Sequence, residues 1–205
     1  MTQDIQNQIN TKIQALSLYH QLAFGVMLAE RYLPNYFAFH LAENWGNPMV
    51  LLNGIDLLKS IIDKRQSDPE ELELIDNLIE SATPDLEDFP GNPLASLALD
   101  ASSMIAECFA FVRDQKPRHI ELCSATSFSS LEIYLQVHEQ MPHDLSAAAL
   151  DKQLSDNVLI KEEVAYQLGV LADLSPEPTI NSKLFIEKTL QAPKVDWAGL
   201  GKMVG

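Results

Sequence analysis

The amino-acid sequence predicts an all-α fold: a single-domain, multi-helix bundle with short, proline-delimited connections. Three observations support this prediction. Residues 13–58 contain only four Asp, Glu, Lys or Arg side chains, so we expect this segment to form the buried inner layer. The segments that follow carry apolar residues at helical spacing. No stretch alternates apolar and polar residues as a half-buried strand does.

The chain has 205 residues, enough for one hydrophobic core. We expect residues 1–190 to form the helical domain and residues 191–205 to form an irregular, apolar C-terminal tail. Cys108 and Cys123 are the only cysteines and lack the C-x-x-C spacing. Packed thiols in a reducing compartment are therefore favoured over a disulfide.

The first helix is expected over residues 4–17, where Ile5, Ile9 and Ile13 recur at helical spacing. Residues 18–31 are apolar on nearly every face, which predicts a central helix. Pro34 is expected to end that helix and to bend the chain at residues 32–33, because a proline disfavours helical backbone before it. A separate helix is then expected over residues 34–44.

Three later helices share one start signal: a side chain that can cap a helix, followed by a proline. The pairs are Asn47-Pro48, Asp68-Pro69 and Asn92-Pro93, and they predict helices over residues 48–64, 69–81 and 93–114. The acidic, proline-rich residues 83–93 predict a loop, with Phe89 inserted into the core. Further helices are expected from residue 117 to about residue 140, and over residues 145–152, 157–174 and 179–190.

Composition excludes several classes of function. The formal net charge is -15, and such a field repels the phosphates of nucleic acids and anionic lipid headgroups. We therefore expect no nucleic-acid ligand and no membrane association. The N-terminus lacks the basic and apolar regions of a secretory signal, which favours a cytoplasmic protein. No cofactor is predicted, because phosphate-binding and dinucleotide-binding motifs are missing.

One string of residues carries a family resemblance. Residues 30–37 read Glu-Arg-Tyr-Leu-Pro-Asn-Tyr-Phe, and Leu57-Leu58, the acidic loop at residues 84–89 and Asp100-Ala101 follow. With these features the chain resembles the YjaG-like family of bacterial proteins, over about residues 11–174. The resemblance implies a helical, cytoplasmic protein typical of gammaproteobacteria, and it transfers no catalytic residue because the family has none assigned.

The same string holds the first candidate site residues, Glu30, Arg31, Pro34, Asn35 and Tyr36. In a functional interpretation, Glu30 is a general base or a metal ligand with a shifted pKa. In a structural interpretation, which we favour, Glu30 and Arg31 hydrogen-bond backbone groups at the predicted bend, or each other's neighbours.

A second candidate is a metal site. His40 and Glu43 lie three residues apart and share a helix face, so they could bind one metal ion. A carboxylate-bridged dimetal site in a bundle needs Glu-x-x-His on two helices, and this chain contains no such motif.

A third candidate is a polar cleft. Asp56 belongs to one polar stripe, and Asp100 and Glu107 belong to another. We expect both stripes to face solvent; if they face each other instead, they line a cleft.

These patterns favour a non-catalytic interaction or regulatory protein. Its partner would be another protein or a second copy of the chain, as in a homodimer, with Trp197, Leu200 and Met203 of the tail as partner-binding residues. The alternative is a bundle that binds a small ligand or metal through Glu30, His40 and Glu43. A third interpretation is an acidic mimic of nucleic acid. Deleting residues 191–205 should change the mass measured by light scattering if the tail mediates association.

Overall fold

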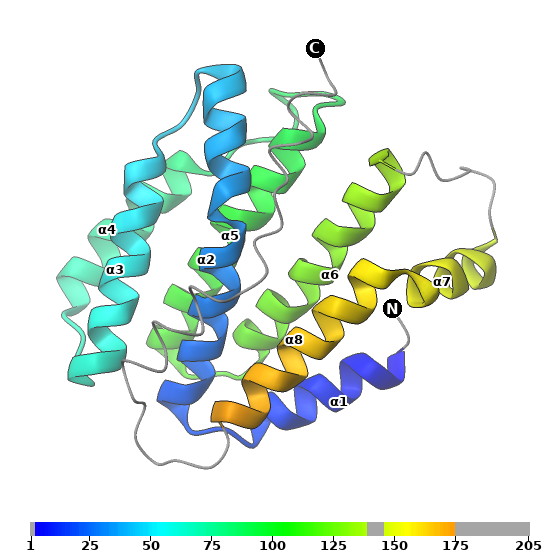
Figure 1. The fold of residues 1–205 in the computed structure, drawn as a ribbon. Helices are drawn as coiled ribbons and strands as arrows, with labels where there is room; N and C mark the ends of the chain where they lie inside the picture. The colour runs from blue at the N-terminus through cyan, green and yellow to red at the C-terminus, as the bar shows by residue number, and fades with distance from the viewer. Residues whose placement is uncertain (1–2, 139–145, 175–205) are drawn as a thin grey trace.

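The computed structural model describes residues 3–138 and 146–174, and within them the chain forms eight α-helices and no strand (Figure 1). The prediction of an all-α bundle is confirmed. The helices are α1 (Gln3–Gln14), α2 (Leu18–Glu43), α3 (Pro48–Lys64), α4 (Pro69–Ala82), α5 (Pro93–Asp114), α6 (Arg118–His138), α7 (Ala147–Asp156) and α8 (Val158–Leu174).

Helix α2 is the centre of the bundle. It contacts α3, α5, α6 and α8, and its most extensive contact is with α5. Every residue from 20 to 29 is buried, as expected for a helix that is apolar on nearly every face. The part of the charge-poor segment that forms α2 is therefore the inner layer on which the other helices pack, whereas residues 41–44, which end the helix, are exposed.

One prediction about α2 is wrong: the helix does not end before Pro34 but continues through it to Glu43. Pro34 lies on an exposed side of the helix. An interior proline costs a helix about 3 kcal/mol. Phe39 and Tyr36 lie beyond it and are fully buried, and burial of side chains of this size contributes about 1.5 to 3 kcal/mol each. Packing on both sides of Pro34 thus outweighs the local preference.

The three predicted capping pairs are confirmed. Asn47 accepts a hydrogen bond from the backbone N–H of Met49, Asp68 from that of Glu70, and Asn92 from that of Leu94. In each case the following proline is the first residue of the helix. The starts of α3, α4 and α5 are consequently determined by two adjacent residues.

Other boundaries differ slightly from the prediction. Helix α1 ends at Gln14, before the predicted residue 17, and α7 extends to Asp156. Helix α8 nearly coincides with the predicted residues 157–174. The helix predicted over residues 179–190 and the tail lie outside the described residues.

An aromatic cluster joins the end of α2 to the loop between α4 and α5. The ring of Phe39 lies 4.9 Å from that of Phe89 and 5.7 Å from that of Trp45. Phe89 thus packs on the core as predicted. Beside this cluster, the Tyr36 hydroxyl donates to the carbonyl of Ala82 and accepts from the N–H of Asn47. This end of the bundle is therefore held together by α2 side chains.

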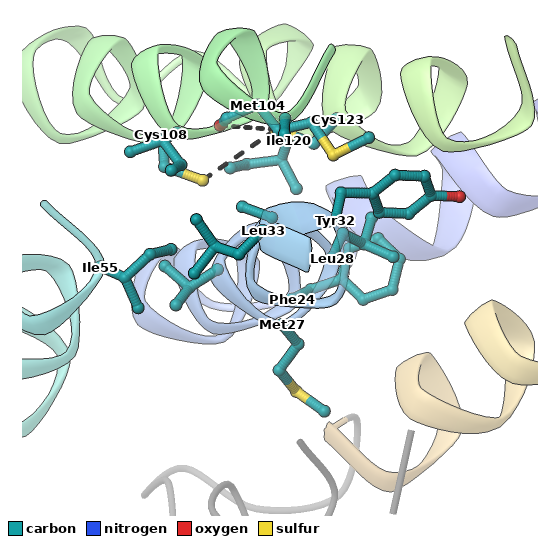
Figure 2. Packing of buried hydrophobic residues seen from close by; sticks show 14 of the residues in the cluster. Phe24, Met27, Leu28, Tyr32, Leu33, Ile55, Met104, Cys108, Ile120 and Cys123 are labelled. Carbon is teal, nitrogen blue, oxygen red and sulfur yellow. Dashed lines mark hydrogen bonds between the residues drawn. The ribbon is translucent and has the colours of Figure 1, made fainter. Parts of the chain in front are cut away.

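Figure 2 shows side chains of α2 packed against α5 and α6. Between α5 and α6, Cys108 and Cys123 are buried, free thiols with their sulfur atoms 4.0 Å apart. By length and composition alone, α5 would qualify as a membrane-spanning helix, as no other helix in the described residues does. However, 56% of its most apolar window is buried inside the bundle, and a core helix meets the same criterion.

Candidate functional site

Arg31 binds Glu163 of α8 in the interior of the bundle. Its two terminal nitrogens donate to the two carboxylate oxygens of Glu163 at 3.2 and 2.9 Å. Both side chains are 2% exposed. The guanidinium also lies over the Tyr166 ring, 3.9 Å from its centroid. This two-pronged ion pair connects α2 with α8.

The ion pair continues into a buried network that reaches α6. The amide nitrogen of Gln167 donates to Glu163 at 2.8 Å and to the Ser127 hydroxyl at 2.6 Å. The amide oxygen of Gln167 accepts from the Ser124 hydroxyl at 2.6 Å. Since each of these groups finds its partner within the protein, the network fastens α2, α6 and α8 together.

The electrostatics of the network follow from its burial. Burial alone would lower the pKa of Arg31, but the attraction and hydrogen bonds of Glu163 leave the pKa raised. Burial also raises the pKa of Tyr166 to about 12. Neither group is brought close to neutral pH, where an acid or base catalyst would operate. What the network does in this structure is hold α2, α6 and α8 together through its hydrogen bonds.

The structural interpretation of Glu30 and Arg31 needs a correction, because there is no bend for them to cap. Glu30 accepts from Lys59 of α3 at 2.7 Å, whereas Arg31 turns to α8. Asn35 is wholly buried, and within residues 3–138 and 146–174 neither its amide nitrogen nor its oxygen has a hydrogen-bond partner. The Tyr36 hydroxyl instead bonds Ala82 and Asn47, at the end of the bundle that holds the aromatic cluster. The string of residues 30–37 therefore distributes its side chains over several neighbouring helices.

His40 and Glu43 are engaged with different groups. The Nδ1 atom of His40 lies 2.9 Å from the carbonyl oxygen of Trp45, while Glu43 accepts from the Asn92 side chain at 2.7 Å. Across residues 3–138 and 146–174, no group of three or more His, Cys, Asp or Glu side chains is arranged to hold a metal ion. The structure thus gives the predicted metal pair no third ligand in that part of the chain.

The predicted cleft residues also separate. Asp56 is exposed on α3. Asp100 accepts from the Ser130 hydroxyl at 2.5 Å, and burial raises its pKa. Of the three, only Glu107 lines the groove described next. One member of the α5 stripe therefore borders a groove, which it shares with α4 and the following loop and not with the stripe of α3.

The groove between α4 and α5 has a volume of about 740 Å³. Its α5 side is formed by Leu99, Ser103, Ala106, Glu107, Ala110 and Arg113, and its α4 side by Asp76 and Glu80. Residues 83–86 close one end, and His119 of α6 also contributes. The groove is solvent-accessible and floored by small and apolar side chains, as binding sites usually are.

The groove combines Ser103, His119 and Glu107, the residue types of a serine hydrolase. The Nδ1 atom of His119 lies 2.6 Å from Glu107, and its Nε2 atom lies 3.1 Å from Asp114. Because carboxylates contact both ring nitrogens, neither nitrogen is left to take a proton from Ser103. The contacts of His119 are therefore those expected of a charged rim around the groove, and not those of the base in a catalytic triad.

The rim of the groove is acidic. Asp76 pairs with Arg113, and Glu107 pairs with His119. Glu80 and Asp85 are exposed and have no cationic partner among the described residues. The groove thus keeps a net negative character that matches the charge of the whole chain.

Sequence reasoning missed Glu163, Gln167 and most of the groove. A signal for the first two was present: an arginine in an apolar helix needs a counter-charge, and Glu163 and Gln167 share a face of α8. The sequence carries no comparable signal for the groove, because the groove depends on how α4 and α5 pack together. The predicted partner-binding residues Trp197, Leu200 and Met203 lie outside the described residues.

Comparisons with known proteins agree with this picture. No curated protein matches the chain. Among solved structures, a DUF416 family protein from Shewanella baltica OS155 is similar, with a TM-score of 0.79 and 24% sequence identity over 89% of this chain and 91% of that one. At this identity the likeness supports the fold alone. The model of the DUF416 family, described as a protein of unknown function, matches residues 8–193. The prediction of a family without an assigned activity is thereby confirmed, and the chain belongs to the DUF416 family.

Proposed function

We propose that this chain is a non-catalytic interaction protein that binds a partner protein in the groove between α4 and α5. The observation that supports the proposal is the groove itself, which joins a volume of about 740 Å³ to a floor of small and apolar side chains. A protein interface needs an apolar centre with a polar rim, and the groove offers both.

Apolar exposure supports the same choice of site. Leu86, which lines the groove, is 40% exposed. Exposed apolar side chains at a groove are typical of interaction sites. We further propose that the protein acts in the cytoplasm and belongs to the YjaG-like, gammaproteobacterial branch of its family.

A photo-crosslinking experiment tests the proposal in cells. A photoreactive amino acid at Ser103, inside the groove, should yield a crosslinked adduct of discrete mass. The adduct should vanish when the floor is filled by Ala110→Trp. The matched control places the photoreactive residue at Asn53, which is exposed on α3. The absence of an adduct at Ser103, or identical adducts at both positions, would overturn the proposal.

A further inference from the structure

We propose that the occupant of the groove is a basic amphipathic helix of a partner protein. This inference rests on the proposed function and names the chemistry of the partner. It follows from three properties of the groove: its length, the size of the side chains on its floor, and the sign of its charge.

The groove has the length and spacing that suit a helix. Its α5 side is marked by Leu99, Ser103, Ala106, Ala110 and Arg113, whose positions advance alternately by four and three residues. Side chains with this spacing follow one seam along a helix, and such a seam packs against another helix. From residue 99 to residue 113 the seam is about 21 Å long, at 1.5 Å per residue. A partner helix of about four turns would fill it.

The floor of the groove allows a partner helix to approach closely. Ser103, Ala106 and Ala110 have small side chains, so a partner helix could lie near the α5 backbone. Leu99 and Leu86 border the same groove and offer apolar contact. An occupant that uses this floor needs an apolar stripe of its own.

The charge of the groove indicates which kind of partner helix would bind. Arg113 and His119 are already paired with Asp76 and Glu107, whereas Glu80 and Asp85 are exposed and without a cationic partner among the described residues. Lysine or arginine beside the apolar stripe of the occupant would complement them. A second copy of the chain would bring another formal charge of -15 and be repelled.

The test uses the full chain and three labelled peptides of about 14 residues, the length that spans the groove. The first has leucine at helical spacing and lysine elsewhere, the second replaces lysine by glutamate, and the third keeps the composition of the first but scrambles the leucines. Fluorescence anisotropy should show binding of the first peptide that weakens with salt. The second and third should bind at least about tenfold more weakly.

Substitutions in the groove and away from it test whether the lysine peptide binds there. Ala106→Trp fills the floor and should weaken binding of the lysine peptide at least about tenfold, whereas Ala42→Trp on the exposed end of α2 should not. The double variant Glu80→Lys/Asp85→Lys should weaken binding of the lysine peptide as strongly as Ala106→Trp does. Asp56→Lys/Asp63→Lys changes the net charge equally at exposed positions of α3 and serves as the control. Circular dichroism verifies that each variant is folded.

Four outcomes would overturn the inference. The lysine peptide fails to bind, or the glutamate peptide binds equally well, or all variants bind the lysine peptide as the wild type does. A dimer seen by light scattering and abolished by Ala106→Trp would make a second copy the occupant and also overturn it. If the peptides fail but the crosslink at Ser103 forms, the chemistry of the partner is wrong while the binding function stands.

Discussion

Arg31 and Glu163 lie 132 positions apart in the chain and meet as a two-pronged ion pair that is almost entirely buried. Arg31 belongs to the central helix α2, and Glu163 belongs to α8, near the end of the described chain. The pair and the amide of Gln167 therefore connect the central helix with a helix near the other end of the described chain.

Removing one member of this pair should be severely destabilising. Glu163→Gln removes the carboxylate that the buried Arg31 guanidinium binds through both terminal nitrogens, and breaking a buried pair in this way typically costs about 3 to 5 kcal/mol. The free energy of unfolding, measured by urea denaturation, should fall by that amount. Glu162→Gln, an exposed neighbour, is the control and should change it by less than about 0.5 kcal/mol.

Replacing both members by apolar residues should recover much of the loss. In Arg31→Met/Glu163→Leu both members of the pair are apolar, and such replacements are often neutral or stabilising. If the double variant is as unstable as Glu163→Gln, the loss does not come from breaking this charge pair, and our account of the pair fails.

Tyr36→Phe should destabilise the end of the bundle where α2, α3 and α4 meet. It removes the donor that satisfies the carbonyl of Ala82, and a buried acceptor without a partner costs about 1 to 3 kcal/mol. Tyr19→Phe is the matched control, since the Tyr19 hydroxyl donates to an exposed carbonyl at Arg65. Equal losses for the two variants in chemical denaturation would contradict the prediction.

The effect of Gly25→Ala on stability should depend on residue 120. A Cβ atom at Gly25 would lie 2.8 Å from Cδ1 of Ile120 and 3.0 Å from the sulfur of Cys108, and such overpacking costs about 1 to 3 kcal/mol. In an Ile120→Val background the nearer clashing methyl is gone and only the contact with the Cys108 sulfur remains. There alanine should destabilise less than in the wild type, because its helix propensity, which exceeds that of glycine by about 1 kcal/mol, offsets the remaining contact. A double-mutant cycle in urea measures both effects, and additive effects would refute the contact.

Asp100 should make stability depend on pH with an unusual sign. Burial raises its pKa in the folded state above the value of the unfolded chain, so the folded protein binds the proton more tightly. The resulting penalty is absent below the unfolded pKa and grows as pH rises through the folded pKa. Asp100→Asn should therefore gain stability relative to the wild type at neutral pH and lose this advantage near pH 3. A constant difference in the free energy of unfolding between the two proteins across this range would argue against it.

Local rules were sufficient for much of the fold. The start of α3 depends on Asn47 and Pro48, and the same pairing of a capping side chain with a proline begins α4 and α5. The burial of residues 20–29 follows from their composition alone. These features involve residues within a few positions of each other, so a pattern in the sequence is enough to predict them.

The sequence by itself determined that the chain is helical, where most helices begin, and that the uncharged residues 20–29 lie inside. Only the tertiary structure decided that α2 continues through Pro34, that Arg31 pairs with Glu163, and that Glu107 borders a groove with α4. The physical reason is the range of the interactions. Capping and helical periodicity act within about one turn, whereas burial and ion pairing depend on neighbours that only the packed bundle brings together.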